Sequence, residues 1–317
     1  MAVYKEISCA MPLNRINSGR LPFHWDLNVY RGCAHACAYC FARYTHRYLG
    51  CDDYDKTIFV KTNIVEKLEA LLSGPNWNRE VINIGGITDS YQPAESRFRF
   101  MPEILKLLIK YKTPAIISTK SSLILRDFDL IRELAEAVPV NIAFTITTAD
   151  EGVRRTLEPG ASQSAARFHA LKEFDKTSAY TGLHLMPIIP FLTDGVGELD
   201  YIMGMAKECG ADYVLPGALY LRGAGSRNTF FTFIQRYHPE LYRELWAMFQ
   251  EGSAARESFK ARLNQTLCAL RKKYGLSFDY RKMVAVAEPL SAQLSMFDFS
   301  AGCSADKIEK RFEEDRS

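Results

Sequence analysis

Three of the eight cysteines lie close together in the segment Arg31-Gly32-Cys33-Ala34-His35-Ala36-Cys37-Ala38-Tyr39-Cys40-Phe41-Ala42-Arg43. They have the spacing Cys-x3-Cys-x2-Cys and directly follow a strand-like run, Trp25 to Tyr30. Thiolates packed this closely repel one another, so their pKa values would rise without a multi-metal partner. Iron–sulfur clusters are held by cysteine thiolates. Three cysteines would bind three irons of a four-iron cluster and leave the fourth iron open to a cofactor or a substrate.

Two other interpretations of the three cysteines stay open at this point. A zinc site needs four ligands, and His35 would complete a Cys3His set. A disulfide would leave one odd thiol. The spacing, with an aromatic residue just before the last cysteine, resembles that of the radical S-adenosylmethionine (SAM) superfamily. This resemblance implies that the open iron chelates SAM, which is then cleaved reductively to a 5′-deoxyadenosyl radical.

Length and composition bound the possible classes of protein. The chain of 317 residues suits one large α/β domain with an appendage, and 47% hydrophobic residues allow a sizeable core. The net charge of +3 permits a nucleic-acid partner but does not indicate one. No run is long and apolar enough to cross a membrane. The other five cysteines are Cys9, Cys51, Cys209, Cys268 and Cys303. They show no pairing pattern, so we expect a reducing, cytoplasmic location.

Short apolar runs alternate with amphipathic stretches after Trp25, as in βα units with a parallel sheet. The predicted strands are Asp26–Tyr30, Val81–Ile87, Ala115–Thr119, Asn141–Thr147, Gly182–Ile188 and Tyr213–Leu215. The predicted helices between them are Ile64–Leu72, Glu103–Tyr111, Asp127–Ala137, Ala165–Asp175 and Tyr201–Cys209. Six units predict an α/β fold, a partial (β/α)6 TIM-type barrel, whose ligands gather at the carboxyl ends of the strands. The resemblance implies that this barrel is of the radical SAM type.

Four regions follow from this pattern. Residues 1–24 are expected to be a mostly irregular N-terminal extension, and residues 25–225 the partial barrel. Residues 226–285 are expected to form a C-terminal helical extension, with helices at Glu240–Gln250 and Ser258–Tyr274. Residues 286–317 are expected to be a tail.

Polar residues follow several predicted strands. After the second, Gly85 and Gly86 would let a ligand approach the backbone, while Thr88 and Asp89 offer a hydroxyl and a carboxylate. The same residues also fit a plain turn with a helix cap. After the third strand, Ser118 and Lys120 share one face. Lys120 would pair with a carboxylate of the ligand, or would simply be solvated.

The fourth and fifth strands carry weaker signals. Thr145 and Thr147 share a face and would bind a ribose or a carboxylate, although threonine is also a common strand former. The prolines at 187 and 190 are expected to end strand pairing. Pro187 would thereby open a backbone edge toward an adenine.

A more specific resemblance covers about residues 12–250. Motifs in the same order are similar to those of the spore photoproduct lyase-like family of radical SAM proteins: Leu27 to Cys33, Phe41-Ala42-Arg43, Thr45-His46, Thr88 to Pro93, Ser118-Thr119-Lys120, Leu125-Arg126-Asp127, Glu158-Pro159 and Pro187 to Pro190. The resemblance implies a [4Fe–4S] cluster on Cys33, Cys37 and Cys40. It also implies SAM contacts from Tyr39, Gly85, Gly86, Thr88, Asp89, Ser118, Lys120, Thr145, Thr147 and Pro187.

The chain departs from the lyase itself at two positions. That enzyme repairs a thymine dimer and returns a hydrogen atom through a cysteine assisted by two tyrosines. The cysteine position is Ile87 here and one tyrosine position is Phe41, while the other tyrosine is present as Tyr39. Tyr39 and Tyr91 are the redox-capable candidates for a catalytic role. Tyr91 would alternatively be a packed aromatic residue.

The tail carries a second resemblance. Gln293-Leu294-Ser295-Met296-Phe297 is similar to the peptide by which bacterial repair and replication proteins bind the β sliding clamp. Gln293, Leu294, Met296 and Phe297 would make the contacts. Alternatively, the segment packs back on the barrel. Basic residues of the C-terminal helical part would contact DNA phosphates, or would be a solvated helix face. They are Arg262, Arg271, Lys272, Lys273, Arg281 and Lys282, and Arg222 and Arg227 flank a glycine-rich loop after the last strand.

The sequence therefore favours a radical SAM enzyme that processes damaged DNA and is recruited to the sliding clamp. A flavodoxin or ferredoxin is the reductant that the resemblance implies. One alternative is a radical SAM enzyme acting on a peptide or a small molecule. Another is a non-enzymatic clamp-binding protein whose Cys33/Cys37/Cys40 site is a structural metal site.

Overall fold

The computed structural model describes residues 2–17, 21–51 and 53–279. Its main sheet has seven strands in the order β10-β9-β8-β7-β6-β3-β2, parallel except for the antiparallel pair β2–β3. Their bounds are β2 Leu13–Arg15, β3 Trp25–Leu27, β6 Ile82–Ile84, β7 Ala115–Thr119, β8 Val140–Thr145, β9 Tyr180–Ile188 and β10 Tyr213–Ala218. The six predicted strands thus occupy consecutive places from β3 to β10, which confirms the α/β fold. The sheet is not closed into a barrel, since β10 and β2 lie at its two ends and do not pair with each other.

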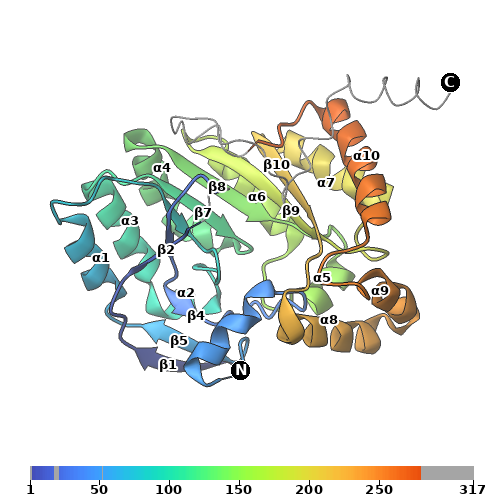
Figure 1. Ribbon diagram of the computed structural model, residues 1–317. Coiled ribbons are helices and arrows are strands. Elements are labelled where there is room, and N and C mark those ends of the chain that lie inside the picture. The colour runs from blue at the N-terminus through green and yellow to red at the C-terminus, as the bar shows by residue number, and fades with distance from the viewer. Residues whose placement is uncertain (1, 18–20, 52, 280–317) are drawn as a thin grey trace, which may run out of the picture.

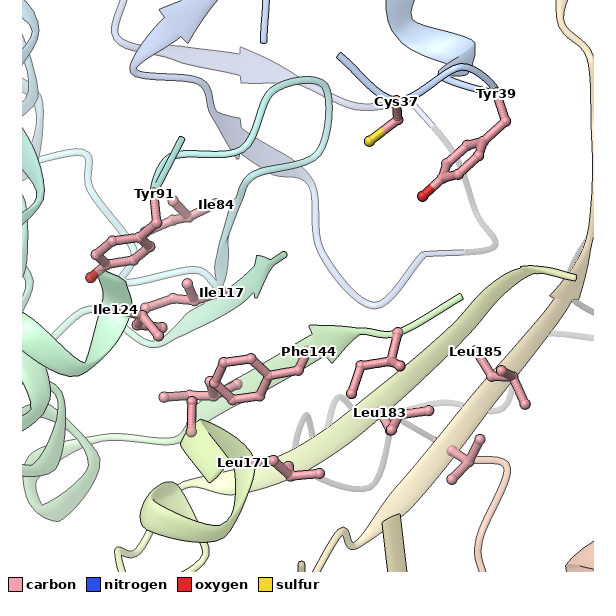
Figure 2. Close-up of a cluster of buried hydrophobic side chains, with 14 of the residues drawn as sticks. Cys37, Tyr39, Ile84, Tyr91, Ile117, Ile124, Phe144, Leu171, Leu183 and Leu185 are labelled. Atoms are coloured by element: carbon pink, nitrogen blue, oxygen red, sulfur yellow. The ribbon is translucent and has the colours of Figure 1, made fainter. Parts of the chain in front are cut away.

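The two faces of the sheet differ in chemistry. Paired positions on neighbouring strands bring Ile84, Ile117, Phe144 and Leu183, all fully buried, onto one face. Figure 2 shows these side chains in the apolar layer that also contains Leu171 from a covering helix. Burying one such side chain contributes about 1.5–3 kcal/mol, so this layer holds helices and sheet together. Because strand residues alternate, polar residues occupy the other face.

Helices cover the outer side of the sheet, and the first and last of them lie at its two ends (Figure 1). Their bounds are α1 Ile64–Leu72, α2 Pro93–Phe98, α3 Phe100–Lys110, α4 Phe128–Ala137, α5 Glu151–Leu157, α6 Ser164–Phe174, α7 Val196–Glu208, α8 Gly223–Tyr237, α9 Tyr242–Met248 and α10 Glu257–Tyr274. Short 3-10 helices occupy η1 Phe41–Leu49, η2 Ser122–Asp127 and η3 Pro239–Leu241. All seven predicted helices are present, with ends shifted by a few residues. None of the helices in the described part of the chain is long and apolar enough to span a membrane.

The first predicted strand, Asp26–Tyr30, is in fact two strands in two sheets. β4 (Tyr30–Arg31) pairs with β5 (Thr57–Lys61), and β5 also pairs with β1 (Val3–Ile7). The two strands are separated at Asn28. Its carbonyl accepts a hydrogen bond from Nζ of Lys61 at 2.6 Å, and not from the backbone of a neighbouring strand. Its side-chain oxygen accepts from the backbone of Ile87 and Thr88. The chain is thereby redirected before the cysteines.

Residues 1–24 also contain two short strands, β1 and β2, that were not predicted from the sequence. One expectation about the C-terminal region needs correction. The glycine-rich segment after β10 is the first turn of α8, not a loop. Arg227 lies within that helix and donates to the carbonyl of Phe249 at 2.8 Å, so its guanidinium is held by the protein itself. The predicted clamp-binding segment, residues 293–297, and the basic residues 281 and 282 lie outside the described residues.

Gly182 provides a test of the packing across β9. A Cβ atom there would lie 2.1 Å from the ring of Tyr213, whereas one at Gly197 in α7 would have nothing within 4 Å. We expect Gly182→Ala to lower the free energy of unfolding by about 1–3 kcal/mol. Gly197→Ala, the matched control, is expected to raise it by about 0.4–1 kcal/mol. Urea unfolding measures both, and equal stability of the two variants would contradict the packing described.

Candidate functional site

The three clustered cysteines lie on a loop, residues 32–40, which we call the cysteine loop. It leaves β4 and runs above the carboxyl ends of the main-sheet strands (Figures 1 and 2). Figure 2 shows Cys37 and Tyr39 both directed from this loop toward the strands that carry Phe144 and Leu185. Cys33 and Cys37 are buried, Cys40 is partly buried, and all three are free thiols. The loop thus presents its thiols at the edge of the sheet where ligands of parallel α/β folds gather.

The three thiols influence one another electrostatically. Burial raises the pKa of Cys37 well above its usual range, and the charges of Glu158, Cys40 and Cys33 raise it further, while Lys120 opposes them. Burial and the neighbouring Cys33 also raise the pKa of Cys40. Such thiols become thiolates only when a positively charged partner binds, which is the behaviour of metal-cluster ligands.

His35 anchors the cysteine loop to the end of β6 through Asp89. The two side chains form a buried ion pair, with 3.3 Å between Nδ1 of His35 and Oδ2 of Asp89. Asp89 also accepts hydrogen bonds from the backbone of Lys120 at 2.7 Å and of Tyr91 at 2.8 Å, and from the Thr119 hydroxyl at 2.8 Å. One carboxylate therefore ties together the loop, the end of β6 and the end of β7.

The state of His35 bears on the zinc alternative. Burial alone would lower its pKa, but Asp89 and Cys33 outweigh burial and raise the pKa to about 10. Within residues 2–17, 21–51 and 53–279, no three His, Cys, Asp or Glu side chains converge on a place for a single metal ion. The structure shows His35 in contact with Asp89, and the choice between a zinc ion and an iron–sulfur cluster stays a prediction.

Glu158 anchors the loop from the opposite side. Its Oε1 accepts hydrogen bonds from the Tyr39 hydroxyl and, at 2.8 Å, from the Thr147 hydroxyl. Its Oε2 lies 2.7 Å from the guanidinium of Arg167, and both side chains are fully buried. Burial opposes the charge of Glu158, but Arg167, Lys120, Tyr39 and Thr147 together lower its pKa to about 2. The carboxylate is therefore a permanent charge beneath the loop.

Backbone contacts reinforce both anchors. Ala38 donates to the carbonyl of Leu157 at 2.9 Å, and Gly160 donates to that of His35 at 3.0 Å. A side chain at Gly160 would lie 2.1 Å from the carbonyl of Ala34, so only glycine allows this approach. The fully buried side chain of Gln92 bonds the start of the loop, at Gly32 and Ala34. The loop conformation is thus specified on every side by the protein.

Lys120 is a further cation near this assembly, in addition to Arg167. Its ammonium lies 5.7 Å from the centre of the Tyr39 ring, and its charge lowers the pKa of Glu158 and opposes the rise at Cys37. Within the described residues the ammonium makes no hydrogen bond or close ion pair. Ser118, two residues earlier on the same face, is partly exposed. These two side chains remain available to a ligand.

Other predicted contacts are engaged with the protein. The Thr88 hydroxyl donates to the carbonyl of Tyr30 at 3.3 Å. The positions of a Cβ at Gly85 and at Gly86 lie 2.6 Å from the Ser118 carbonyl and from Asp26, so neighbouring residues account for both glycines. Whether these residues touch a cofactor stays a prediction.

Two more of the predicted SAM contacts, Thr145 and Pro187, lie on β8 and β9. The carbonyl of Thr145 accepts a hydrogen bond from Arg167 at 2.8 Å. β9 ends at Ile188, within the run from Met186 to Pro190 where the prolines are expected to end pairing. Its ladder with β10 shifts register before the last pair, Ile188 with Ala218.

Tyr91 and Tyr39 occupy different surroundings. Tyr91 is fully buried next to Ile84 and Ile124, and its hydroxyl points away from Cys37 (Figure 2). Burial and the charges of Asp127 and Glu95 raise its pKa well above the usual range. This geometry supports the alternative of a packed aromatic residue. Tyr39, in contrast, lies between the cysteines and the Glu158 carboxylate.

Comparison with known sequences identifies the superfamily. The sequence model of the radical SAM superfamily matches residues 27–199, which include the cysteine loop and the strands from β6 to β9. The chain belongs to the radical SAM superfamily. An uncharacterized protein of Mycobacterium tuberculosis is 36% identical over 282 residues, covering 88% of this chain and 83% of that protein. An uncharacterized protein of Methanocaldococcus jannaschii is 26% identical over 262 residues, covering 81% and 90%.

The fold of this superfamily member is also found among solved structures. A spore photoproduct lyase variant with bound AdoMet and dinucleoside spore photoproduct has a TM-score of 0.62 and 12% identity, covering 85% of this chain and 78% of that chain. A second lyase structure, complexed with the dinucleoside spore photoproduct, has a TM-score of 0.61 and 14% identity, covering 86% and 79%. At this identity the comparison establishes a shared fold.

Sequence reasoning missed the roles of several residues. Glu158 appeared only as part of a matching motif, and Arg167 only as part of an amphipathic helix. The available signal was Arg167 itself, a charged residue on the apolar face of α6 beside Phe168 and Leu171. Such a placement indicates a buried partner of opposite charge. Ser226, whose hydroxyl donates to the carbonyl of Cys40 at 2.8 Å, carried no signal, because the start of α8 was unpredicted.

Replacing Glu158 tests this anchor of the cysteine loop. Glu158→Gln leaves the charge of Arg167 buried without a partner, so we expect the free energy of unfolding to fall by about 3–5 kcal/mol at neutral pH. Glu158→Gln combined with Arg167→Met removes both charges and should recover part of this loss. The control Glu103→Gln, in an exposed pair with Lys106, should change stability by less than about 0.5 kcal/mol.

The pH dependence of the same variant has a definite sign. The pKa of Glu158 is lowered from 4.5 to about 2. Its contribution to the free energy of unfolding is therefore complete above pH 4.5 and is lost as the pH falls through about 2. The difference in unfolding free energy between the wild type and Glu158→Gln should therefore narrow across that range. Urea titrations at several pH values measure it, and a constant difference would contradict the buried carboxylate.

Proposed function

We propose that this protein is a radical SAM enzyme of the spore photoproduct lyase-like family. In this proposal Cys33, Cys37 and Cys40 hold a [4Fe–4S] cluster. When bound, the cluster supplies the electron that cleaves SAM to a 5′-deoxyadenosyl radical. The observation that carries the proposal is the cysteine loop, whose three coupled thiols are held by two buried carboxylates above the uncommitted ammonium of Lys120.

The protein's own residues have distinct tasks in this proposal. Asp89 and Glu158 keep the cysteine loop in place through His35 and Tyr39. Lys120 offers a positive charge to the carboxylate of SAM, and Ser118 offers a hydroxyl beside it. The other proposed SAM contacts are Gly85, Gly86, Thr88, Thr145, Thr147 and Pro187.

We further propose damaged DNA as the substrate. Support comes from the fold shared with spore photoproduct lyase structures that contain AdoMet and a dinucleoside lesion. The reaction must differ from that of spore photoproduct lyase in its final hydrogen transfer. The side chains at the relay positions, Ile87 and Phe41, have no thiol or phenol hydrogen to donate. The proposed reaction is hydrogen abstraction from a nucleobase or sugar by the deoxyadenosyl radical, with a hydrogen donor other than that relay.

Two partners complete the proposal. Gln293, Leu294, Met296 and Phe297 would bind the β sliding clamp as a short peptide, which would bring the enzyme to replicating DNA. A flavodoxin or ferredoxin would supply the electron for SAM cleavage.

Cleavage of SAM is the first expected outcome. After anaerobic reconstitution with iron and sulfide and reduction by dithionite, the wild type should release 5′-deoxyadenosine, and UV-irradiated DNA should increase the rate. Cys37→Ala should lose both the cluster absorbance and the product, because one of three thiol ligands is gone. Cys51→Ala, a cysteine outside the set, should retain both.

The outcomes separate the candidate functions. Product formation indifferent to irradiated DNA would support a radical SAM enzyme with a peptide or small-molecule substrate and contradict the DNA proposal. An intact cluster that releases no 5′-deoxyadenosine would contradict the enzyme and favour a structural metal site.

The clamp peptide is tested separately. Phe297→Ala removes the aromatic anchor and should weaken binding to purified β clamp by about tenfold or more, because such anchors carry most of the binding energy. SAM cleavage should stay unchanged in this variant. The exchange Ser295→Ala, which leaves the apolar anchors in place, is the control. Equal binding of clamp by Phe297→Ala and wild type would exclude this docking segment.

A further inference from the structure

Three side chains from neighbouring strands meet on the polar face of the main sheet. The hydroxyl of Tyr213 on β10 donates a hydrogen bond to Oδ1 of Asn141 on β8 at 3.0 Å. It also lies 3.3 Å from Nε2 of His184 on β9. These residues are far apart in the sequence, and neither the radical initiator nor the cysteine loop uses them.

The backbone of β9 makes this meeting possible. Gly182 pairs with Tyr213, and the ring of Tyr213 lies where a side chain of residue 182 would be, at 2.1 Å from the position of a Cβ. The ring therefore crosses β9 and reaches β8. It stacks on Tyr180, with 5.3 Å between the ring centres. Any larger residue at 182 would prevent the contact with Asn141.

The hydrogen bonds define which nitrogen of His184 carries the proton. The single hydroxyl proton of Tyr213 points to Asn141, so the phenol oxygen accepts from Nε2–H of His184. Burial and the nearby charge of Lys120 lower the pKa of His184 to about 3, so the ring is neutral. In the neutral ring, Nδ1 is then a bare hydrogen-bond acceptor.

The surroundings of His184 suit a ligand. His184 pairs in register with Thr145, on the face that also carries Ser118 and Lys120 near the cysteine loop, and part of its surface is accessible to solvent. In addition, Nδ2 of Asn141 is fully buried and has no hydrogen-bond partner among the described residues. Unpaired buried donors cost stability, so packing alone does not explain this arrangement.

The charge at this place selects the class of ligand. The positive charge of Lys120 disfavours a cationic donor group next to His184, and an ionised carboxylate or phosphate group has no proton for the Nδ1 acceptor. An uncharged ring N–H satisfies both conditions, as in the imide of a pyrimidine base. We propose that His184 Nδ1 accepts the ring N–H of a nucleobase of the substrate, with Tyr213 and Asn141 as positioning residues. This inference rests on the proposed function and names the substrate contact within that site.

Binding to a chemically matched pair of ligands tests the contact. The probes are UV-irradiated thymidine dinucleotide and its counterpart methylated at N3 before irradiation, titrated into the reconstituted protein with SAM. Methylation removes the N–H donor, so the wild type should bind the methylated probe about tenfold more weakly. His184→Ala should lose about the same factor on the unmethylated probe and should not distinguish the two probes. His169→Ala, an exposed histidine on α6, should behave as wild type.

Two further measurements keep the outcomes distinct. Nitrogen-15 spectra of histidine-labelled wild type should show Nδ1 of His184 unprotonated, and Tyr213→Phe should abolish the preference for that tautomer. If His184→Ala still distinguishes the probes as the wild type does, the inference is overturned while the proposed substrate stands. If the wild type cleaves SAM but binds neither probe, both the DNA substrate and this contact are overturned. A protonated Nδ1 in the wild type would also overturn the contact.

Discussion

The structure depends on holding three cysteine thiols together on one short loop. Their proximity is unfavourable without a bound cation, since burial and mutual repulsion raise the pKa values of Cys37 and Cys40. The protein restrains the loop with two buried carboxylates. Asp89 binds it through His35, and Glu158 binds it through Tyr39. Because Asp89 follows β6 and Glu158 directly follows α5, two separate elements of the fold fix the loop conformation.

The buried pair of Glu158 and Arg167 illustrates how this restraint is built. Burying two charges is expensive, and replacement by apolar residues is often neutral for stability. Here the pair also receives hydrogen bonds from Tyr39 and Thr147 and donates to the carbonyls of Thr145 and Ser162. The pair therefore contributes mainly geometric specificity, because it orients Tyr39 and the adjacent cysteines with respect to β8.

Regular elements of the fold were predictable where one physical signal dominated. The apolar strands and amphipathic helices from Ile82 to Cys209 were found in the right order, since burial of one face repeats along each element. Predictions failed where a single side chain redirected the backbone. Asn28 divides the first strand by binding Lys61 and the turn at Thr88. The first turn of α8 forms from residues rich in glycine because Ser226 binds the cysteine loop.

The sequence by itself determined the superfamily and the fold class of this protein, through three cysteines at a superfamily spacing and the α/β pattern. Those properties are local, so neighbouring residues suffice to reveal them. Only the tertiary structure decided the partners of the charged and polar groups. It joined Tyr39 to Glu158 and Arg167, and His184 to Tyr213 and Asn141. These contacts cross tens of residues of chain, and their formation depends on strand order and register, which local composition does not encode.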